Sequence, residues 1–239
     1  MMDIEKIKAI AFDFGGTLDS PFQHWMEVYL YYYVTEFYLP LTKESFRESY
    51  VYAEQMMERL PLVQPSHSLL ETQQVKLQLQ FEKMIARYLL PDVYEYFEKV
   101  PNEAARLITD YATANVNVSK PVLAALAKRY PLLLVSNYYG NLKKVVTDLG
   151  IAPYFVSITD STIERIRKPD PALWKIAFDR QGYAPEEVLV VGDSMKNDIF
   201  PALSLGCQVV HGCPDLSQEE VLPSVNRISS LDELPALLL

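Results

Sequence analysis

Five short apolar runs, rich in β-branched residues, divide this chain, and four of them lie in its second half. They are apolar throughout, which is typical of parallel strands buried on both faces of a sheet. Helix-like segments separate the later runs, and such alternation indicates an α/β domain. We therefore expect a Rossmann-like parallel sheet of at least five strands in the order 5-4-1-2-3. The expected strands are Ile7–Phe14, Leu132–Asn137, Phe155–Thr159, Val188–Gly192 and Gln208–His211.

The segments between the later runs carry residues that start and stop helices. Ser119 and Asp170 are expected N-caps, and Gly150 and Gly206 follow helix ends. The right-handed crossover rule then places each helix between parallel strands. The expected helices are Pro121–Tyr130, Asn141–Leu149, Pro171–Gln181 and Lys196–Leu205.

The segment between the first two runs is too long for a simple crossover, so we expect it to form a domain of its own. Its apolar residues recur at helical spacing in four stretches, with prolines between them. The sequence predicts an all-α helical-bundle cap over residues 21–116, inserted into a core formed by residues 1–20 and 117–239. The aromatic run Tyr29–Tyr33 fits the core of this bundle better than a ligand-stacking surface.

Composition excludes several classes of partner. The chain carries 22 basic and 31 acidic residues, a formal charge of −9, without a basic run. We therefore expect no nucleic-acid or membrane-surface binding, and a small ligand instead. The N-terminus lacks a secretion signal and no apolar stretch approaches the roughly 20 residues of a membrane span, so we expect a soluble, cytoplasmic protein. Cys207 and Cys213 lack partners at zinc spacing and are expected to be plain thiols.

Two expected strands end in carboxylates. The sequence AFDFGGTLDS places Asp13 at the carboxyl end of the first strand, where α/β folds bind ligands. VLVVGDSMKND places Asp193 at the end of the fourth, with Asp198 five residues later. Buried carboxylates require compensation, and oxygen ligands suit Mg²⁺ better than Zn²⁺. Asp198 has three open roles: direct ligation, ligation through water, or stabilisation of the helix start.

Two further polar sites follow strands or lie in the loops after them, Ser136-Asn137 and Lys168. A hydroxyl and loop amides donate hydrogen bonds to a phosphate, and a lysine adds positive charge. Lys168 would also shield Asp13 from the negative oxygens of an incoming phosphoryl group. These residues predict a phosphate site beside the carboxylates.

Four motifs in this order resemble the haloacid dehalogenase-like (HAD) superfamily, in the branch with a helical C1-type cap after the first strand. They are DFGGT from Asp13, SN from Ser136, KPDP from Lys168 and GDSMKND from Gly192. The resemblance implies a phosphatase in which Asp13 attacks phosphorus to form an aspartyl-phosphate that water hydrolyses. It implies Mg²⁺ as the cofactor and a small phosphorylated metabolite as the substrate.

The resemblance also assigns roles to individual residues. Thr17 supports the loop, Ser136 and Lys168 orient the phosphate, and the cap closes over the substrate. The implied catalytic residues are Asp13, Thr17, Ser136 and Lys168. The implied substrate-binding residues are Gly16, Ser136, Asn137 and Lys168. The implied metal ligands are Asp13, Gly15 through its carbonyl, Asp193 and Asp198.

The chain departs from the family pattern at Gly15, where phosphatases usually carry a second Asp as general acid and base. Such a group contributes about 10²–10⁴-fold in rate, so we expect weak or leaving-group-selective hydrolysis. Three explanations are open. The leaving group needs little protonation, a cap residue such as His24 supplies the proton, or the chain is catalytically feeble.

Other reaction types also lack that Asp. A dehalogenase needs no metal, whereas GDSMKND retains the acidic metal-binding pattern. A phosphonate-cleaving enzyme needs a neutral cap lysine, and nothing in the sequence around Lys43, Lys76 or Lys83 marks one. A ligand-binding or regulatory protein without turnover is the alternative from another class. Gly15 supports it, and the retained acidic and basic cluster opposes it.

Overall fold

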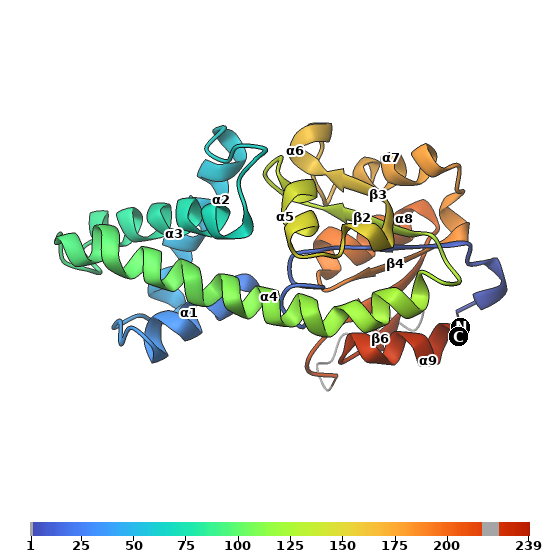
Figure 1. Cartoon of the computed structure of the whole chain (residues 1–239), viewed down its shortest axis with the longest axis horizontal. Helices are drawn as coiled ribbons and strands as arrows, with labels where there is room; N and C mark the ends of the chain where they lie inside the picture. The colour runs from blue at the N-terminus through green and yellow to red at the C-terminus, as the bar shows by residue number, and fades with distance from the viewer. Residues whose placement is uncertain (1, 217–224) are drawn as a thin grey trace.

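The computed structural model describes residues 2–216 and 225–239, which contain a six-stranded parallel sheet (Figure 1). The order β3-β2-β1-β4-β5-β6 contains the predicted order of five strands, read from the opposite edge. The sixth strand was not predicted, because three residues with the sequence NRI carry no apolar run. The strands are β1 Ala9–Phe12, β2 Leu132–Ser136, β3 Phe155–Asp160, β4 Val188–Gly192, β5 Gln208–Gly212 and β6 Asn226–Ile228.

β1 lies between β2 and β4 and is buried along its whole length. Its side chains alternate between the two faces of the sheet, so Ile10 and Phe12 enter one apolar cluster while Ala9 and Ala11 enter the other. Burial on both faces explains why the strand is apolar throughout. The first and fourth strands are therefore direct neighbours, and the residues that follow them meet at one edge.

Helices cover both faces of the sheet. The last turns of α4 Val100–Leu126 pack on one face together with α5 Leu142–Asp148 and α9 Leu234–Leu238. α7 Ala172–Gln181 and α8 Phe200–Leu205 pack on the other face. The short remaining elements are α6 Ser161–Glu164, the 3₁₀ turns η1 Ile4–Lys6, η3 Ala152–Tyr154, η4 Pro185–Glu187 and η6 Leu231–Glu233, and the π-helical turns η2 Glu95–Lys99 and η5 Met195–Ile199.

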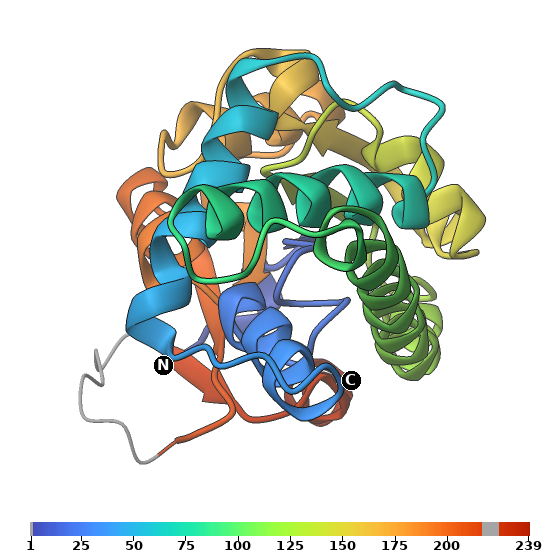
Figure 2. The same ribbon diagram turned by 90° about the vertical axis from the view of Figure 1, so that its left-hand side faces the viewer.

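The insert after β1 is helical, as predicted. It contains α1 Trp25–Thr35, α2 Lys43–Arg59, α3 Leu69–Ala86 and the first part of α4, which lie to one side of the sheet in Figure 1 and in front of it in Figure 2. These helices share an apolar cluster that includes Tyr33, Phe46 and Phe81. Tyr29 and Tyr33 are fully buried in it, as expected for bundle core, whereas Tyr31 is exposed.

The separate helix expected over 121–130 was wrong. α4 is one helix of 27 residues with Pro121 inside it, and it ends at Leu126. Ser119 is therefore not an N-cap; its hydroxyl donates to the carbonyl oxygens of Leu18 and Asn115, both 3.2 Å away. Because α4 runs unbroken past residue 116, the boundary predicted there does not coincide with a helix end, and the division into core and cap stays a prediction.

Gly150 and Gly206 follow helix ends as expected, but the N-cap of α7 is Pro171 and not Asp170. The helix expected from Lys196 consists of the π-helical turn η5 followed by α8. Asp170 accepts a hydrogen bond from the Ala172 amide at 2.9 Å at the start of α7, and Gly206 ends α8 with φ of +94°. Both cysteines are free, and burial raises the pKa of the Cys207 thiol to about 12. Among the helices of residues 2–216 and 225–239, none is long and apolar enough to span a bilayer.

Candidate active site

The loop after β1 places Asp13 at the carboxyl edge of the sheet. The Asp13 amide donates to the Val191 carbonyl oxygen at 3.0 Å, which ties the start of this loop to β4. Gly16 has φ of +98°, and a Cβ atom there would lie 2.6 Å from the carboxylate oxygens of Asp193. Only glycine accommodates both this backbone conformation and this close approach.

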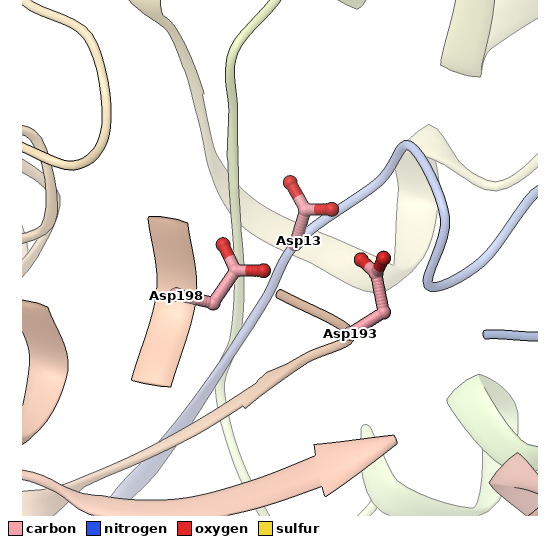
Figure 3. Close-up of side chains that lie close together, drawn as sticks. All are labelled: Asp13, Asp193 and Asp198. Carbon is pink, nitrogen blue, oxygen red and sulfur yellow. The ribbon is translucent and has the colours of Figure 1, made fainter. Parts of the chain in front are cut away.

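Three carboxylates converge at this edge (Figure 3). Asp13 follows β1, Asp193 follows the neighbouring β4, and Asp198 lies in the π-helical turn η5. One oxygen from each can be chosen so that all three lie within 4.8 Å of one another. A Cβ atom at Gly192 would lie 2.5 Å from Cβ of Asp198, so glycine there permits the turn to fold back onto the strand.

Lys168 is buried among these acids. Its Nζ lies 2.5 Å from Oδ1 of Asp13 and 2.7 Å from Oδ1 of Asp198, and it also donates to the Val135 carbonyl oxygen at 3.1 Å. Burial by itself would lower the pKa of Lys168, but attraction to Asp13 and Asp198 outweighs it and raises that pKa. The ammonium group is therefore charged at neutral pH.

Asn137 positions the Lys168 backbone. Its amide group donates to the Lys168 carbonyl oxygen at 2.9 Å, and its oxygen accepts from the Lys168 amide at 2.8 Å. The side chain predicted to bind substrate is thus engaged with the protein, although Asn137 lines the same cavity.

Two hydroxyl groups complete the contacts of the carboxylates. Ser136, the last residue of β2, lies with Oγ 3.1 Å from Oδ1 of Asp13. Thr17 lies with Oγ1 3.4 Å from Oδ2 of Asp13 and 3.2 Å from Oδ1 of Asp193. The structure thus brings the predicted residues Asp13, Thr17, Ser136, Lys168, Asp193 and Asp198 into one contact network, with Gly15, Gly16 and Asn137 lining the adjoining cavity.

The cluster holds more negative than positive charge. Burial, followed by repulsion from Asp13 and Asp198, raises the pKa of Asp193 well above its usual value. Burial also raises the pKa of Asp198, to about 6, although Lys168 opposes this shift. A divalent cation would relieve this repulsion, and a donor set of oxygen atoms alone fits a hard cation.

The two oxygens of Asp198 already have partners. Oδ1 accepts from Lys168, and Oδ2 accepts from the Ser194 amide at 3.0 Å. Among the described residues, one hydrogen-bond donor contacts the Asp193 carboxylate, the hydroxyl of Thr17. Asp193 is therefore the more available ligand of the two.

The cluster opens onto a cavity of about 290 Å³, which residues of α1, α2 and α3 also line. Sequence reasoning missed several of its residues. Asp19 could have been identified from the sequence, because it lies in the same loop segment, AFDFGGTLDS, as Asp13. The others lie on faces of cap helices or in loops that no motif marks: Trp25, Glu54, Gln73 and Arg167. Lys76 also lines the cavity, and the sequence did not distinguish it from the other two cap lysines.

The structure also bears on His24, weighed as a substitute proton donor, and on Lys76, weighed for phosphonate cleavage. His24 lines the cavity, but its Nδ1 accepts from the Met26 amide at 3.2 Å and burial lowers its pKa, so the ring is neutral. Lys76 lines the cavity too, but it pairs with Glu54 at 2.8 Å. Burial by itself would lower the pKa of Lys76, but attraction to Glu54, Tyr29 and Asp19 together outweighs it and raises that pKa. Lys76 therefore lacks the neutral amine that imine chemistry requires.

Comparison with known proteins agrees with this geometry. The sequence model of the haloacid dehalogenase-like hydrolase family matches residues 7–206, which is most of the chain. The chain belongs to the haloacid dehalogenase-like hydrolase family. This HAD membership agrees with the four motifs, and the parallel sheet with helices is the fold of the family's solved structures.

Relatives of this HAD chain include enzymes of different names. It is 35% identical over 131 residues to the phosphoglycolate phosphatase of Escherichia coli, covering 51% of this chain and 50% of that protein. The chain spans about half the length of the curated relatives it matches. The magnesium-bound structure of the HAD hydrolase YfnB of Bacillus subtilis has a TM-score of 0.59 at 20% identity, covering 97% of this chain and 98% of that one. A dehalogenase structure has a TM-score of 0.65 at 18% identity, covering 100% and 99%.

Asp19 generates a prediction about stability. Its Oδ1 accepts from the Gly16 amide at 2.7 Å and from Nε1 of Trp25 at 3.2 Å, yet burial raises its pKa to about 7, with a further rise from Asp13. The folded state then holds a proton that the unfolded chain has already lost. Stability contributed by this proton is present below about pH 4 and is lost as pH rises towards 7. In Asp19→Asn, the free energy of unfolding should therefore fall less steeply between pH 4 and 7.

Denaturant titrations without divalent ions at several pH values measure this slope. Asp179→Asn is the control, because Asp179 is an exposed residue of α7 that pairs only with Lys175 among the described residues. If the free energy of unfolding of Asp19→Asn changes with pH as steeply as that of wild type, the raised pKa of Asp19 is contradicted.

Proposed function

We propose that this chain is a Mg²⁺-dependent phosphatase that acts on a small phosphorylated metabolite, with Asp13 as the nucleophile. The observation that carries the proposal is the contact network of Asp13, Lys168, Asp193 and Asp198 at the mouth of one cavity. The similarity to phosphoglycolate phosphatases supports phosphorus chemistry. The acidic cluster favours this over metal-free dehalogenation.

The metal would be held by Asp13, the carbonyl of Gly15 and Asp193, with Asp198 acting directly or through water. Bound Mg²⁺ would supply charge neutralisation for the carboxylates and the phosphate oxygens. Lys168 would keep Asp198 in place and present its ammonium group beside the nucleophile. An anionic phosphate could then approach Asp13 without facing an unscreened negative charge.

The reaction would proceed in two steps. A carboxylate oxygen of Asp13 attacks phosphorus, an O–P bond forms, and the bond from phosphorus to the leaving-group oxygen breaks. Water then attacks phosphorus of the aspartyl-phosphate, which releases inorganic phosphate and restores the carboxylate. Ser136 and Lys168, both within hydrogen-bond distance of Asp13, would orient the transferred group.

The leaving group must still gain a proton, and Gly15 cannot donate one. The explanations from a reactive leaving group and from low activity stand, whereas the lowered pKa of His24 disfavours it as the proton donor. Asp19 is a further candidate, because it lines the cavity and its burial-raised pKa of about 7 leaves it partly protonated at neutral pH.

The first prediction here concerns the nucleophile. Asp13→Asn should lower Mg²⁺-dependent phosphate release by about 10³-fold or more, because the amide cannot form the phosphoenzyme. Phosphate release is measured over a panel of sugar, nucleotide, acyl and aryl phosphates, with Asp179→Asn as the control. Unchanged release by Asp13→Asn would remove the nucleophile assignment. Halide release from haloacids without metal would favour a dehalogenase.

The second prediction concerns the metal. Protons compete with Mg²⁺ for Asp193 and Asp198, whose pKa values burial raises. Mg²⁺ should therefore raise the melting temperature at pH 8 and have little effect at pH 5. Linkage gives about 2.7 kcal/mol at a free ion concentration about 100 times Kd. Differential scanning calorimetry at matched ionic strength tests this, and Asp193→Asn should lose the response. Equal stabilisation at both pH values would count against the site.

The third prediction concerns Gly15. A Cβ atom there would lie 3.8 Å from Nε1 of Trp25, an ordinary contact, so the loop has room for a side chain. Gly15→Asp should raise kcat on alkyl phosphates, by up to about 10²–10⁴-fold, and change aryl phosphates less. Gly15→Asn is the matched control without a transferable proton. If Asp and Asn at this position behave alike, protonation does not limit the rate.

A further inference from the structure

The cap side of the cavity contains a buried ion pair. Lys76 of α3 lies with Nζ 2.8 Å from Oε1 of Glu54 of α2, and the two side chains are 9% and 29% exposed. Oε2 of Glu54 accepts from the hydroxyl of Tyr139 at 2.6 Å, in the loop after β2. Both oxygens of Glu54 are therefore engaged, and its charge cancels that of Lys76.

The other cations of the cavity also have acidic partners. Among the described residues that line the cavity, the lysines and arginines are Lys76, Arg167 and Lys168. Nε of Arg167 lies 3.4 Å from Oε1 of Glu58, and Lys168 is bound to the catalytic carboxylates. A substrate with a carboxylate on its leaving group would bring a second anion to a surface without an unmatched cation. Desolvating that anion would be unfavourable.

Hydrogen-bond donors remain available on the same side, one from an uncharged amide and the others from the charge-compensated Lys76. The Gln73 side-chain oxygen accepts from the hydroxyl of Tyr29 at 2.7 Å, and its NH₂ group has no hydrogen-bond partner among residues 2–216 and 225–239. Lys76 has three N–H donors and uses one on Glu54. Its Nζ also lies 4.9 Å from the ring centre of Tyr139. The cap side thus offers donors without net charge, beside aromatic rings.

We propose that the leaving group of the substrate is an uncharged polyhydroxyl group, a single sugar or a shorter polyol, whose oxygens accept from Lys76 and Gln73. This inference rests on the proposed phosphatase function. A cavity of about 290 Å³ suits a compound of that size. Glu54 is the specificity-determining residue, because its charge cancels that of Lys76. The chain would therefore disfavour phosphoglycolate, whose leaving group carries a carboxylate.

Matched substrates isolate this charge. Glycerol 3-phosphate and 3-phosphoglycerate have the same number of carbons and differ in whether the distal carbon bears a hydroxyl or a carboxylate. Wild type should show kcat/KM about tenfold or more higher for glycerol 3-phosphate. Glu54→Gln leaves Lys76 with unmatched charge and should shift the ratio of the two kcat/KM values about tenfold towards 3-phosphoglycerate.

Glu48→Gln is the matched control. Glu48 also lies on α2 and also pairs with a lysine of α3, Lys83, at 3.0 Å, but neither residue lines the cavity. In Glu48→Gln, the ratio of the kcat/KM values for the two substrates should equal that of wild type. A wild-type preference for 3-phosphoglycerate, or equal ratios in Glu54→Gln and wild type, would overturn the inference.

The same design separates this inference from the proposed function. Mg²⁺-dependent hydrolysis of p-nitrophenyl phosphate tests the proposed phosphatase function alone. If the protein hydrolyses this compound but prefers 3-phosphoglycerate to glycerol 3-phosphate, only the inference about the leaving group is rejected. Calorimetric binding of both compounds to Asp13→Asn with Mg²⁺ measures the preference without turnover. Tighter binding of 3-phosphoglycerate would overturn the inference, and tighter binding of glycerol 3-phosphate would support it even where no phosphate is released.

Discussion

The contact of Lys168 with Asp13 and Asp198 is the interaction on which the site depends. Three carboxylates in a buried cluster repel one another, and a single ammonium group donates to two of them. The sheet makes this arrangement possible, because β1 and β4 are neighbours and their carboxyl ends lie at one edge. Asn137 then holds the Lys168 backbone from the next strand along, so three adjacent strands and the Lys168 loop position the ion pair.

The two sides of the cavity differ in their charge balance. The core side has an excess of carboxylates over lysine, which favours a cation and then an anionic phosphate. The cap side carries the compensated pair of Glu54 and Lys76, which favours a neutral group with oxygen acceptors. The Tyr139 hydroxyl joins the two sides, because it extends from the loop after β2 to Glu54 of α2. Under the proposed function, phosphate binding and recognition of the rest of the substrate would belong to different parts of the chain.

Several features were predictable for clear physical reasons. Strands buried on both faces are apolar along most of their length, so β1, β2 and β4 stand out in the sequence, whereas the polar three-residue β6 does not. The separate helix expected from Pro121 was wrong for a tertiary reason. Ser119 donates to the Leu18 carbonyl oxygen instead of capping a helix, and α4 continues through Pro121 to pack on the sheet.

The sequence by itself determined the family and the strand order. It also determined which acidic and basic residues converge at one sheet edge, because each of these residues follows a strand or lies in a loop after one. Only the tertiary structure decided which cap residues face that edge. Glu54, Gln73 and Lys76 lie on long helices whose orientation depends on packing against one another, and no local pattern distinguishes Lys76 from Lys83. Helical periodicity indicates which residues share a face, but the side chains that meet across α2, α3 and the loop after β2 depend on how those elements pack.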